Sequence, residues 1–269
     1  MDLQGKDDAD ARFSAHVDGL ASVLGHADRA GPFHDYVVGL MVPGERKSVE
    51  PMAARTAPAR TSAQHQKLLH FVGVTAWSDD KVLAKVAEMV LPAIERHGPI
   101  EAWIVDDTGF PKKGSHSVGV TRQWCGQLGK QDNCQVAVSL SLANRHASLP
   151  VAYRLYVPRE WAEDRVRRTK AGIPEEIGFR TKPEIALEQI RAACDAGLPR
   201  GVVLMDAGYG NHTVLRAGIT PSDWPMWPAS CRRPRSGLRG WRRCLRSRGR
   251  AAGVLPSSSN EAPTTSPSR

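Results

Sequence analysis

The stretch Ile100-Glu101-Ala102-Trp103-Ile104-Val105-Asp106-Asp107-Thr108-Gly109-Phe110-Pro111 decides the fold class. Its largely apolar first half is typical of a short buried strand, and the residues after the two acids are typical of a turn. A second run of this design, Gly201 to Met205, ends in Asp206 and turns through Ala207-Gly208-Tyr209-Gly210, where the glycines are expected to permit a sharp bend. Each strand is therefore expected to deliver an acid to one edge of a sheet, where a divalent cation can be held.

The rest of the chain changes its hydrophobic period once, near residue 99. Residues 10–95 have helical spacing, with Ser78 as an expected helix cap. Further strands are expected near 118–123, 134–142, 150–157 and 201–205. Between the last two of these strands, a capping box of Thr181 and Glu184 predicts the start of a helix that ends at Gly197. The order predicts an α/β fold with a mixed sheet, preceded by a helical N-terminal region.

Positive charge is concentrated at the C-terminal end. The chain has a formal net charge of +9, and residues 221–269 contain ten Arg and no Lys against Asp223 and Glu261. That tail thus carries +8, and residues 1–220 are nearly neutral, so the overall charge says little about the folded part. With seven prolines, nine serines and few aliphatic residues, the tail is expected to be disordered.

Composition also excludes several classes of protein. The five cysteines form no Cys-x-x-Cys pair, which argues against a zinc site or a disulfide framework. The first residues are polar and acidic, and no apolar run approaches the roughly 20 residues of a membrane span. A cytoplasmic location is therefore expected, without a membrane partner.

Together with Lys112-Lys113-Gly114, residues 125–135 and the Pro-Gly-Glu-Arg-Lys-Ser-Val-Glu-Pro segment at 43–51, the two acidic runs resemble the DDE superfamily endonucleases, the transposases of bacterial insertion sequences. The resemblance covers roughly residues 30–220. It implies a ribonuclease H-like fold in which the two acid-bearing strands lie side by side. The expected domains are a helical region at 1–98 that is a candidate for DNA contact, a partial catalytic domain at 99–220 and a tail at 221–269. The last strand and the closing helices of that fold are expected to be absent, so the chain is expected to be a truncated or frameshifted copy. An evolved basic DNA-binding tail is the alternative.

The resemblance also implies the site residues. Asp107 matches the first catalytic and metal-binding position of the family and Asp206 the second, while Asp106 is an alternative metal ligand. Since strand neighbours point to opposite faces, only one of Asp106 and Asp107 can face the metal. Mg²⁺ or Mn²⁺ is the expected cofactor, because two such ions can activate the attacking oxygen and stabilise the leaving one in phosphodiester chemistry. The third family acid has no counterpart, since Glu261 lies in the tail with no helix to position it.

DNA is the expected partner, namely the ends of the mobile element and the target DNA. A homodimer is a candidate assembly. When bound to DNA, the protein is expected at the nucleoid. Candidate phosphate contacts are Lys112, Lys113, His116, Arg122 and Lys130, and in the helical region Arg46, Lys47, Arg55 and Arg60. Ordinary solvated side chains are the alternative for each. Trp161, in the charged segment 158–165, is a candidate for stacking on a displaced base, with core packing as its alternative.

The sequence suggests two candidate functions. The first is a DDE transposase that cleaves and joins DNA, expected here to be catalytically incompetent. The second is a non-enzymatic DNA-binding or inhibitory fragment of such a transposase. A phosphatase of the haloacid dehalogenase type is excluded, because its nucleophile motif needs Asp-x-Asp and this chain has adjacent acids.

Overall fold

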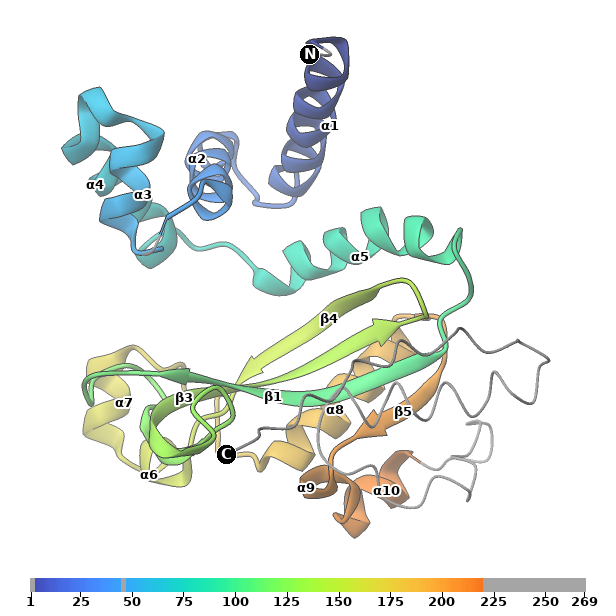
Figure 1. The fold of residues 1–269 in the computed structure, drawn as a ribbon. Coiled ribbons are helices and arrows are strands. Elements are labelled where there is room, and N and C mark those ends of the chain that lie inside the picture. Colours follow the sequence, from blue (N-terminus) through green and yellow to red (C-terminus); the bar gives the residue numbers. More distant parts are fainter. Residues whose placement is uncertain (1–2, 45–46, 220–269) are drawn as a thin grey trace, which may run out of the picture. The chain divides into compact units, whose positions relative to one another are not determined.

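The computed structural model describes residues 3–44 and 47–219 of the chain (Figure 1). Their contacts divide the chain into two compact units, which are described one at a time. Among the described residues, the first unit combines 3–44, 47–101, 139–154 and 193–200, and the second combines 102–138, 155–192 and 201–219. The predictions of a disordered tail, a missing last strand and missing closing helices concern residues outside the described ranges.

The first unit contains the helical N-terminal region expected from the sequence. Its helices are α1 (Leu3–Ala21), η1 (Ala27–Arg29), α2 (Ala30–Met41), α3 (Val49–Thr56), η2 (Pro58–Arg60), α4 (Thr61–Gly73) and α5 (Asp79–Glu95). Ser78 caps α5 as predicted, since its Oγ accepts a hydrogen bond from the Lys81 N–H at 3.2 Å. The cap satisfies one of the amide groups that the first helical turn leaves without a partner.

Burial of the apolar faces holds these helices together. Val17, Leu24, Phe33 and Phe71 are buried in one cluster, and the rings of Phe71 and Trp77 stack with their centroids 5.7 Å apart. Residues three or four apart share one face of a helix, so the apolar side chains of these helices meet in one core.

A buried asparagine attaches the end of α5 to the turn that follows β3. The Asn144 side-chain amide donates to the carbonyl oxygens of Ile94 at 3.0 Å and Gly98 at 2.8 Å. Its Oδ1 accepts the N–H groups of His146 and Ala147, so the buried side chain is fully used in fixing the turn.

A five-stranded sheet carries the two acidic segments. The strands are β1 (Ala102–Pro111), β2 (Thr121–Cys125), β3 (Lys130–Ala143), β4 (Ser148–Leu155) and β5 (Val202–Met205). Their order is β2-β3-β1-β5, with β4 also paired to β3. Strands β2 and β3 are antiparallel, whereas β1 and β5 are parallel. The α/β fold with a mixed sheet, predicted from the sequence, is confirmed, and so is the pairing of the two acid-bearing strands.

Strand β1 is longer than the sequence suggests. The expected strand ends before Asp106, but β1 continues through both acids and the Thr-Gly-Phe-Pro segment to Pro111. The reason is pairing with β3: the N–H of Lys112, directly after β1, donates to Asn133 at 2.9 Å. Gly109 fits because a Cβ there would lie 3.0 Å from the Cα of Cys125 in β2. The glycine thus permits a close approach of two strands instead of ending one.

The remaining helices of the second unit follow the strands. They are α6 (Arg159–Ala162), α7 (Arg165–Ala171), α8 (Lys182–Asp195), α9 (Ala207–Gly210) and α10 (Thr213–Ile219). The predicted capping box is present at the start of α8: the Thr181 N–H donates to Glu184 at 2.7 Å, and the Thr181 Oγ1 accepts the Glu184 N–H at 3.4 Å. The buried Gln189 amide donates to Val138 of β3 at 3.0 Å, which ties α8 to the sheet.

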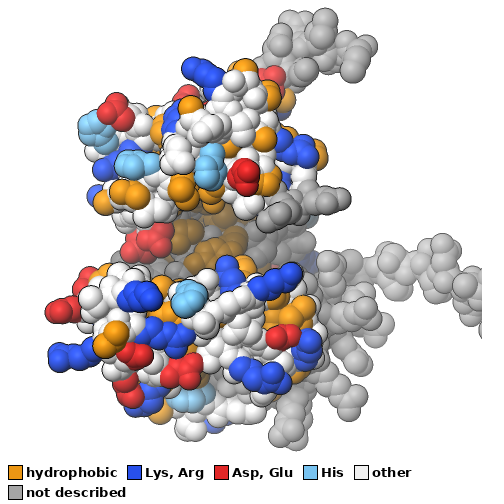
Figure 2. All heavy atoms as spheres, turned by 90° about the vertical axis from the view of Figure 1, so that its left-hand side faces the viewer, with side chains coloured by type: hydrophobic (Ala, Val, Ile, Leu, Met, Phe, Trp, Pro, Cys, Tyr) orange, Lys and Arg blue, Asp and Glu red, His pale blue; other side chains and the backbone are white. Residues whose placement is uncertain are grey.

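Lys and Arg side chains form no single large patch on the face shown in Figure 2, where they alternate with Asp and Glu side chains. This mixture agrees with the near-neutral charge that the sequence assigns to residues 1–220. Among the described helices, none is both long and apolar enough to cross a membrane.

Candidate functional site

The register of β1 and β5 brings the acidic residues to neighbouring positions. Val105 pairs with Met205 at the last aligned position, and the next residue along each strand is Asp106 or Asp206. In a parallel pair the chains leave the sheet in the same direction, so the acids are delivered to the same end. The pairing of the apolar residues of β1 and β5 thereby brings Asp106 and Asp206 to neighbouring positions, although they are 100 residues apart in the sequence.

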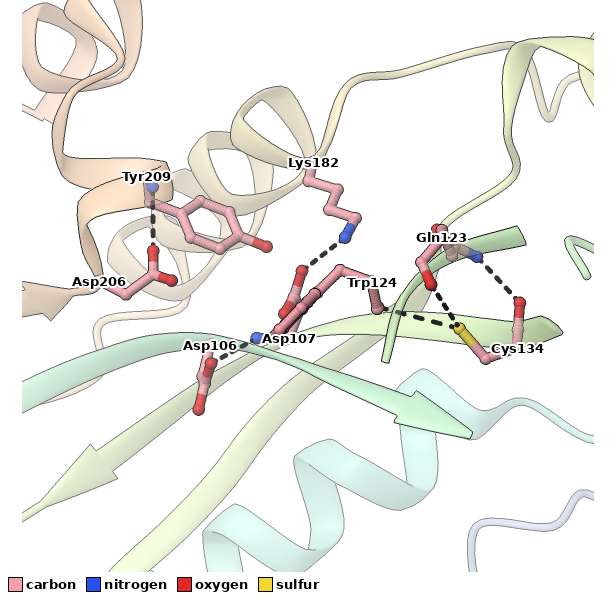
Figure 3. Close-up of polar contacts among 8 residues, drawn as sticks. All are labelled: Asp106, Asp107, Gln123, Trp124, Cys134, Lys182, Asp206 and Tyr209. Atoms are coloured by element: carbon pink, nitrogen blue, oxygen red, sulfur yellow. Dashed lines mark hydrogen bonds and ion pairs between the residues drawn. The ribbon is translucent and has the colours of Figure 1, made fainter. Parts of the chain in front are cut away.

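The pleat of β1 separates Asp106 from Asp107. Asp107 shares its side of the strand with the buried residues Trp103 and Val105 and is itself half-buried, while Asp106 is exposed. The Asp106 Oδ1 accepts the Asp107 N–H at 2.8 Å. In Figure 3 the Asp107 carboxylate points toward Lys182, whereas that of Asp106 points away from it.

The surroundings of Asp106 disfavour the charged form of its carboxyl group. Partial desolvation raises its pKa above the ordinary value, and the negative charges of Asp107 and Asp206 raise it further, while the hydrogen bond from the Asp107 amide works against them. The three carboxylates thus form one electrostatic group. A bound cation would relieve the repulsion among them.

Asp107 is paired with a lysine that sequence reasoning missed. The Lys182 Nζ lies 2.6 Å from the Asp107 Oδ2, and each side chain is about a quarter exposed, at 26% and 27%. Lys182 is the first residue of α8, where the capping box fixes the backbone, and its ammonium also lies 5.6 Å from the centre of the Tyr156 ring. The capping box marks the start of the helix in the sequence, but the partner is 75 residues away and no local pattern identifies it.

Asp206 has a structural task as well as a place in the site. It is the N-cap of α9, and its Oδ1 accepts the Tyr209 N–H at 3.1 Å. The predicted sharp bend at Gly208 and Gly210 is instead a short helix in which neither glycine has a positive φ. Gly208 provides room, because a Cβ there would lie 3.1 Å from the Asp206 Oδ1.

Tyr209 is the second residue that sequence reasoning missed. Its side chain is 4% exposed, and in the described part of the chain its hydroxyl has no hydrogen-bond partner. Burial raises the pKa of this phenol strongly, and the charges of Asp107, Asp206 and Asp106 raise it further. The hydroxyl therefore stays protonated and is a donor without an acceptor, which is uncommon for a buried polar group.

The predicted DNA-contacting residues have different environments. Lys112, Lys113, His116, Arg122 and Lys130 are all exposed, and Lys130 pairs with Asp132 at 3.0 Å. In the helical region Arg55 and Arg60 are exposed, the Lys47 ammonium donates to the carbonyl groups of Gly39 and Val42, and Arg46 lies outside the described residues. Their contacts with DNA stay predictions.

For Trp161 the structure favours the packing alternative over base stacking. The side chain is 1% exposed, its Nε1–H donates to the Val120 carbonyl at 2.8 Å, and the Arg167 guanidinium covers the ring at 3.6 Å. The ring is buried in a cluster with Val120 and Val157, so no face is open to a base. Among the described residues of this unit, Trp124 on β2 is an exposed tryptophan, at 56%.

The donors around Asp107 suit a hard divalent cation, because Mg²⁺ and Mn²⁺ prefer carboxylate oxygens. Within residues 3–44 and 47–219, however, no three His, Cys, Asp or Glu side chains converge closely enough to form a metal site on their own. The carboxylates present thus fit part of a coordination shell.

Comparison with known proteins agrees with this geometry. Residues 19–251 match the family described as DDE superfamily endonuclease, so the match begins before the resemblance read from the sequence and extends beyond residue 220, where that resemblance was expected to stop. Over 145 residues the chain is 35% identical to a protein of Microchaete diplosiphon named as the probable transposase for insertion sequence element IS701. The aligned region is 54% of this chain and 35% of that relative, so the chain spans about a third of the relative's length. Endonucleases of this superfamily depend on divalent metal ions. Because the family match covers most of its length, the chain belongs to the DDE superfamily endonucleases.

Proposed function

We propose that the chain is a transposase of an insertion sequence, which cleaves and joins DNA with Mg²⁺ or Mn²⁺ held by Asp107 and Asp206. The observation that carries the proposal is the parallel pairing of β1 and β5, which brings these acids to one end of the sheet. Family membership supports the reaction class, and the relative's name supports an insertion sequence. The DNA partners would be the ends of the element and the target DNA.

Within this proposal the residues have separate tasks. Asp107 and Asp206 would hold the cation, and Asp106, on the opposite side of β1, contributes negative potential. The cation, when bound, supplies activation of the attacking oxygen and stabilisation of the leaving one. The α9 cap fixes the Asp206 carboxylate, and the α8 capping box fixes the backbone of Lys182 beside Asp107. A fixed Asp206 carboxylate matters because small displacements of catalytic groups cost large factors in rate.

Asp107→Ala tests the metal site directly. We expect the parent chain to bind Mn²⁺ weakly, and this variant to lose that binding, because a single remaining carboxylate leaves most of the shell to water. Calorimetric titration of Mn²⁺ into both proteins measures the effect. Asp132→Ala, which removes a half-buried carboxylate paired with Lys130, is the matched control and should bind Mn²⁺ as the parent does. Unchanged binding in Asp107→Ala would show that Asp107 is not a ligand.

A non-enzymatic DNA-binding or inhibitory protein is the second candidate function. The observation that favours it is the absence, among the described residues, of a third side chain that completes a metal site. Such a protein would occupy DNA without cutting it, because a misplaced or missing ion leaves one side of the scissile phosphate unsupported.

A nicking assay separates the two candidates. The first candidate predicts specific nicking at the ends of the element with Mg²⁺ or Mn²⁺, whereas the second predicts strongly salt-dependent binding that leaves these ends uncut. Denaturing electrophoresis of end-labelled DNA detects any cut strand. Specific nicking that disappears in both Asp107→Ala and Asp206→Asn would identify an active enzyme, and bound but intact DNA would favour the second candidate.

A further inference from the structure

The Lys182 ammonium lies where a cation bound to Asp107 would be expected. It is 2.6 Å from the Asp107 Oδ2, and both side chains are mostly shielded from solvent. Two positive charges cannot both lie against one carboxylate oxygen without strong repulsion, which is least screened where water is partly excluded. If a divalent cation binds Asp107, the lysine must therefore move away.

A second observation indicates that this place is built for a ligand. The Tyr209 hydroxyl is buried within the field of Asp106, Asp107 and Asp206, and it lacks an acceptor among the described residues. Figure 3 shows the Tyr209 ring extending from α9 toward the space between Asp206 and Lys182. A phosphate oxygen would accept from this hydroxyl and would also attract the ammonium, whereas carboxylates alone leave the hydroxyl unpaired.

We propose that Lys182 exchanges partners during binding: it neutralises Asp107 in the empty site, and it transfers to a DNA phosphate oxygen when a divalent cation takes up Asp107. The inference rests on the proposed function. Lysine suits the exchange, because its compact charge sits on a flexible four-carbon stem with three donors. Because Lys182 is in the first turn of α8, its backbone stays in place while its side chain moves. Lys182 is thus both a competitor of the metal and a substrate contact.

The first test compares Mn²⁺ affinities of the full chain in the absence of DNA. We expect Lys182→Gln to bind Mn²⁺ more tightly than the parent, on the order of tenfold, because the competing charge is removed. Lys182→Arg should bind it more weakly than the parent, since a guanidinium grips a carboxylate through two hydrogen bonds. Lys170→Gln removes an exposed lysine of α7 and should leave the affinity unchanged. Lys182→Arg keeps the ion pair with Asp107, so its Mn²⁺ affinity tests the proposal even if Lys182→Gln does not fold.

The second test measures how DNA affinity falls with salt, for a short duplex with Ca²⁺ or with a chelator. Each phosphate neutralised by a protein cation adds about 0.9 to the slope of log K against log salt concentration. With Ca²⁺ the slope of Lys182→Gln should be smaller than that of the parent by about this amount, and with chelator the two slopes should agree. Lys170→Gln should have the parent's slope in both conditions.

The outcomes separate the inference from the function on which it rests. Unchanged or weaker Mn²⁺ binding in Lys182→Gln, or an equal loss of slope with and without Ca²⁺, would overturn the exchange and leave a fixed ion pair or a fixed phosphate contact. If Asp107→Ala binds Mn²⁺ like the parent, the proposed function itself fails, whichever result Lys182 gives.

Discussion

Asp206→Asn is expected to abolish Mn²⁺ binding without lowering thermal stability, whereas Asp206→Ala is expected to lose both. The Asp206 Oδ1 caps α9 by accepting the Tyr209 N–H at 3.1 Å, and asparagine caps a helix about as well as aspartate. Alanine cannot cap, which costs about 0.5–2 kcal/mol. The asparagine amide oxygen is an uncharged and weaker ligand than a carboxylate, so the asparagine variant isolates the contribution of the charge.

Calorimetry with Mn²⁺ and thermal melting of the two variants give the comparison. Asp164 offers a matched control, because it caps α7 in the same way, accepting the Arg167 N–H at 2.9 Å, and is not part of the acidic group. Asp164→Ala should lose similar stability and keep Mn²⁺ binding. Undiminished Mn²⁺ binding in Asp206→Asn would remove Asp206 from the metal site and leave it a helix cap.

Trp161→Ala is expected to destabilise the second unit by about 3–5 kcal/mol, the range for removing a large buried aromatic side chain. The change opens a cavity beside Val120 and Val157 and leaves the Val120 carbonyl without its 2.8 Å hydrogen bond. A typical domain has only about 5–15 kcal/mol of stability, so most of it would be lost. Val157 follows Tyr156, whose ring lies 5.6 Å from the Lys182 ammonium, so the damage would extend to the site.

Denaturant titration monitored by circular dichroism measures the loss. Trp124→Ala is the matched control, because that tryptophan is 56% exposed and its truncation should change the free energy of unfolding by less than about 0.5 kcal/mol. Should Trp161→Ala unfold at the parent's denaturant concentration, the ring would contribute little to the core, and base stacking would again be the better explanation of this residue.

The amino-acid sequence by itself determined the architecture that places the acids. The apolar runs before Asp106 and Asp206 predict two buried strands, and the structure pairs them in parallel. The Ser78 cap and the Thr181 capping box predict where α5 and α8 begin, because such caps depend on side chains within a few residues of the helix end. Signals of this kind are local, so they can be read without knowing the rest of the fold. The predicted domain boundaries and the metal-binding role of each acid stay predictions.

Only the tertiary structure decided how the acids are surrounded. Pairing with β3 extends β1 past Asp107 to Pro111, although the local residues favour a turn, because hydrogen bonds between distant strands outweigh a weak local preference. The partner of Asp107 comes from α8, and the unpaired hydroxyl comes from Tyr209. Burial of Trp161 likewise depends on Val120, 41 residues away. These contacts depend on packing between segments far apart in the chain, which a local sequence pattern does not encode.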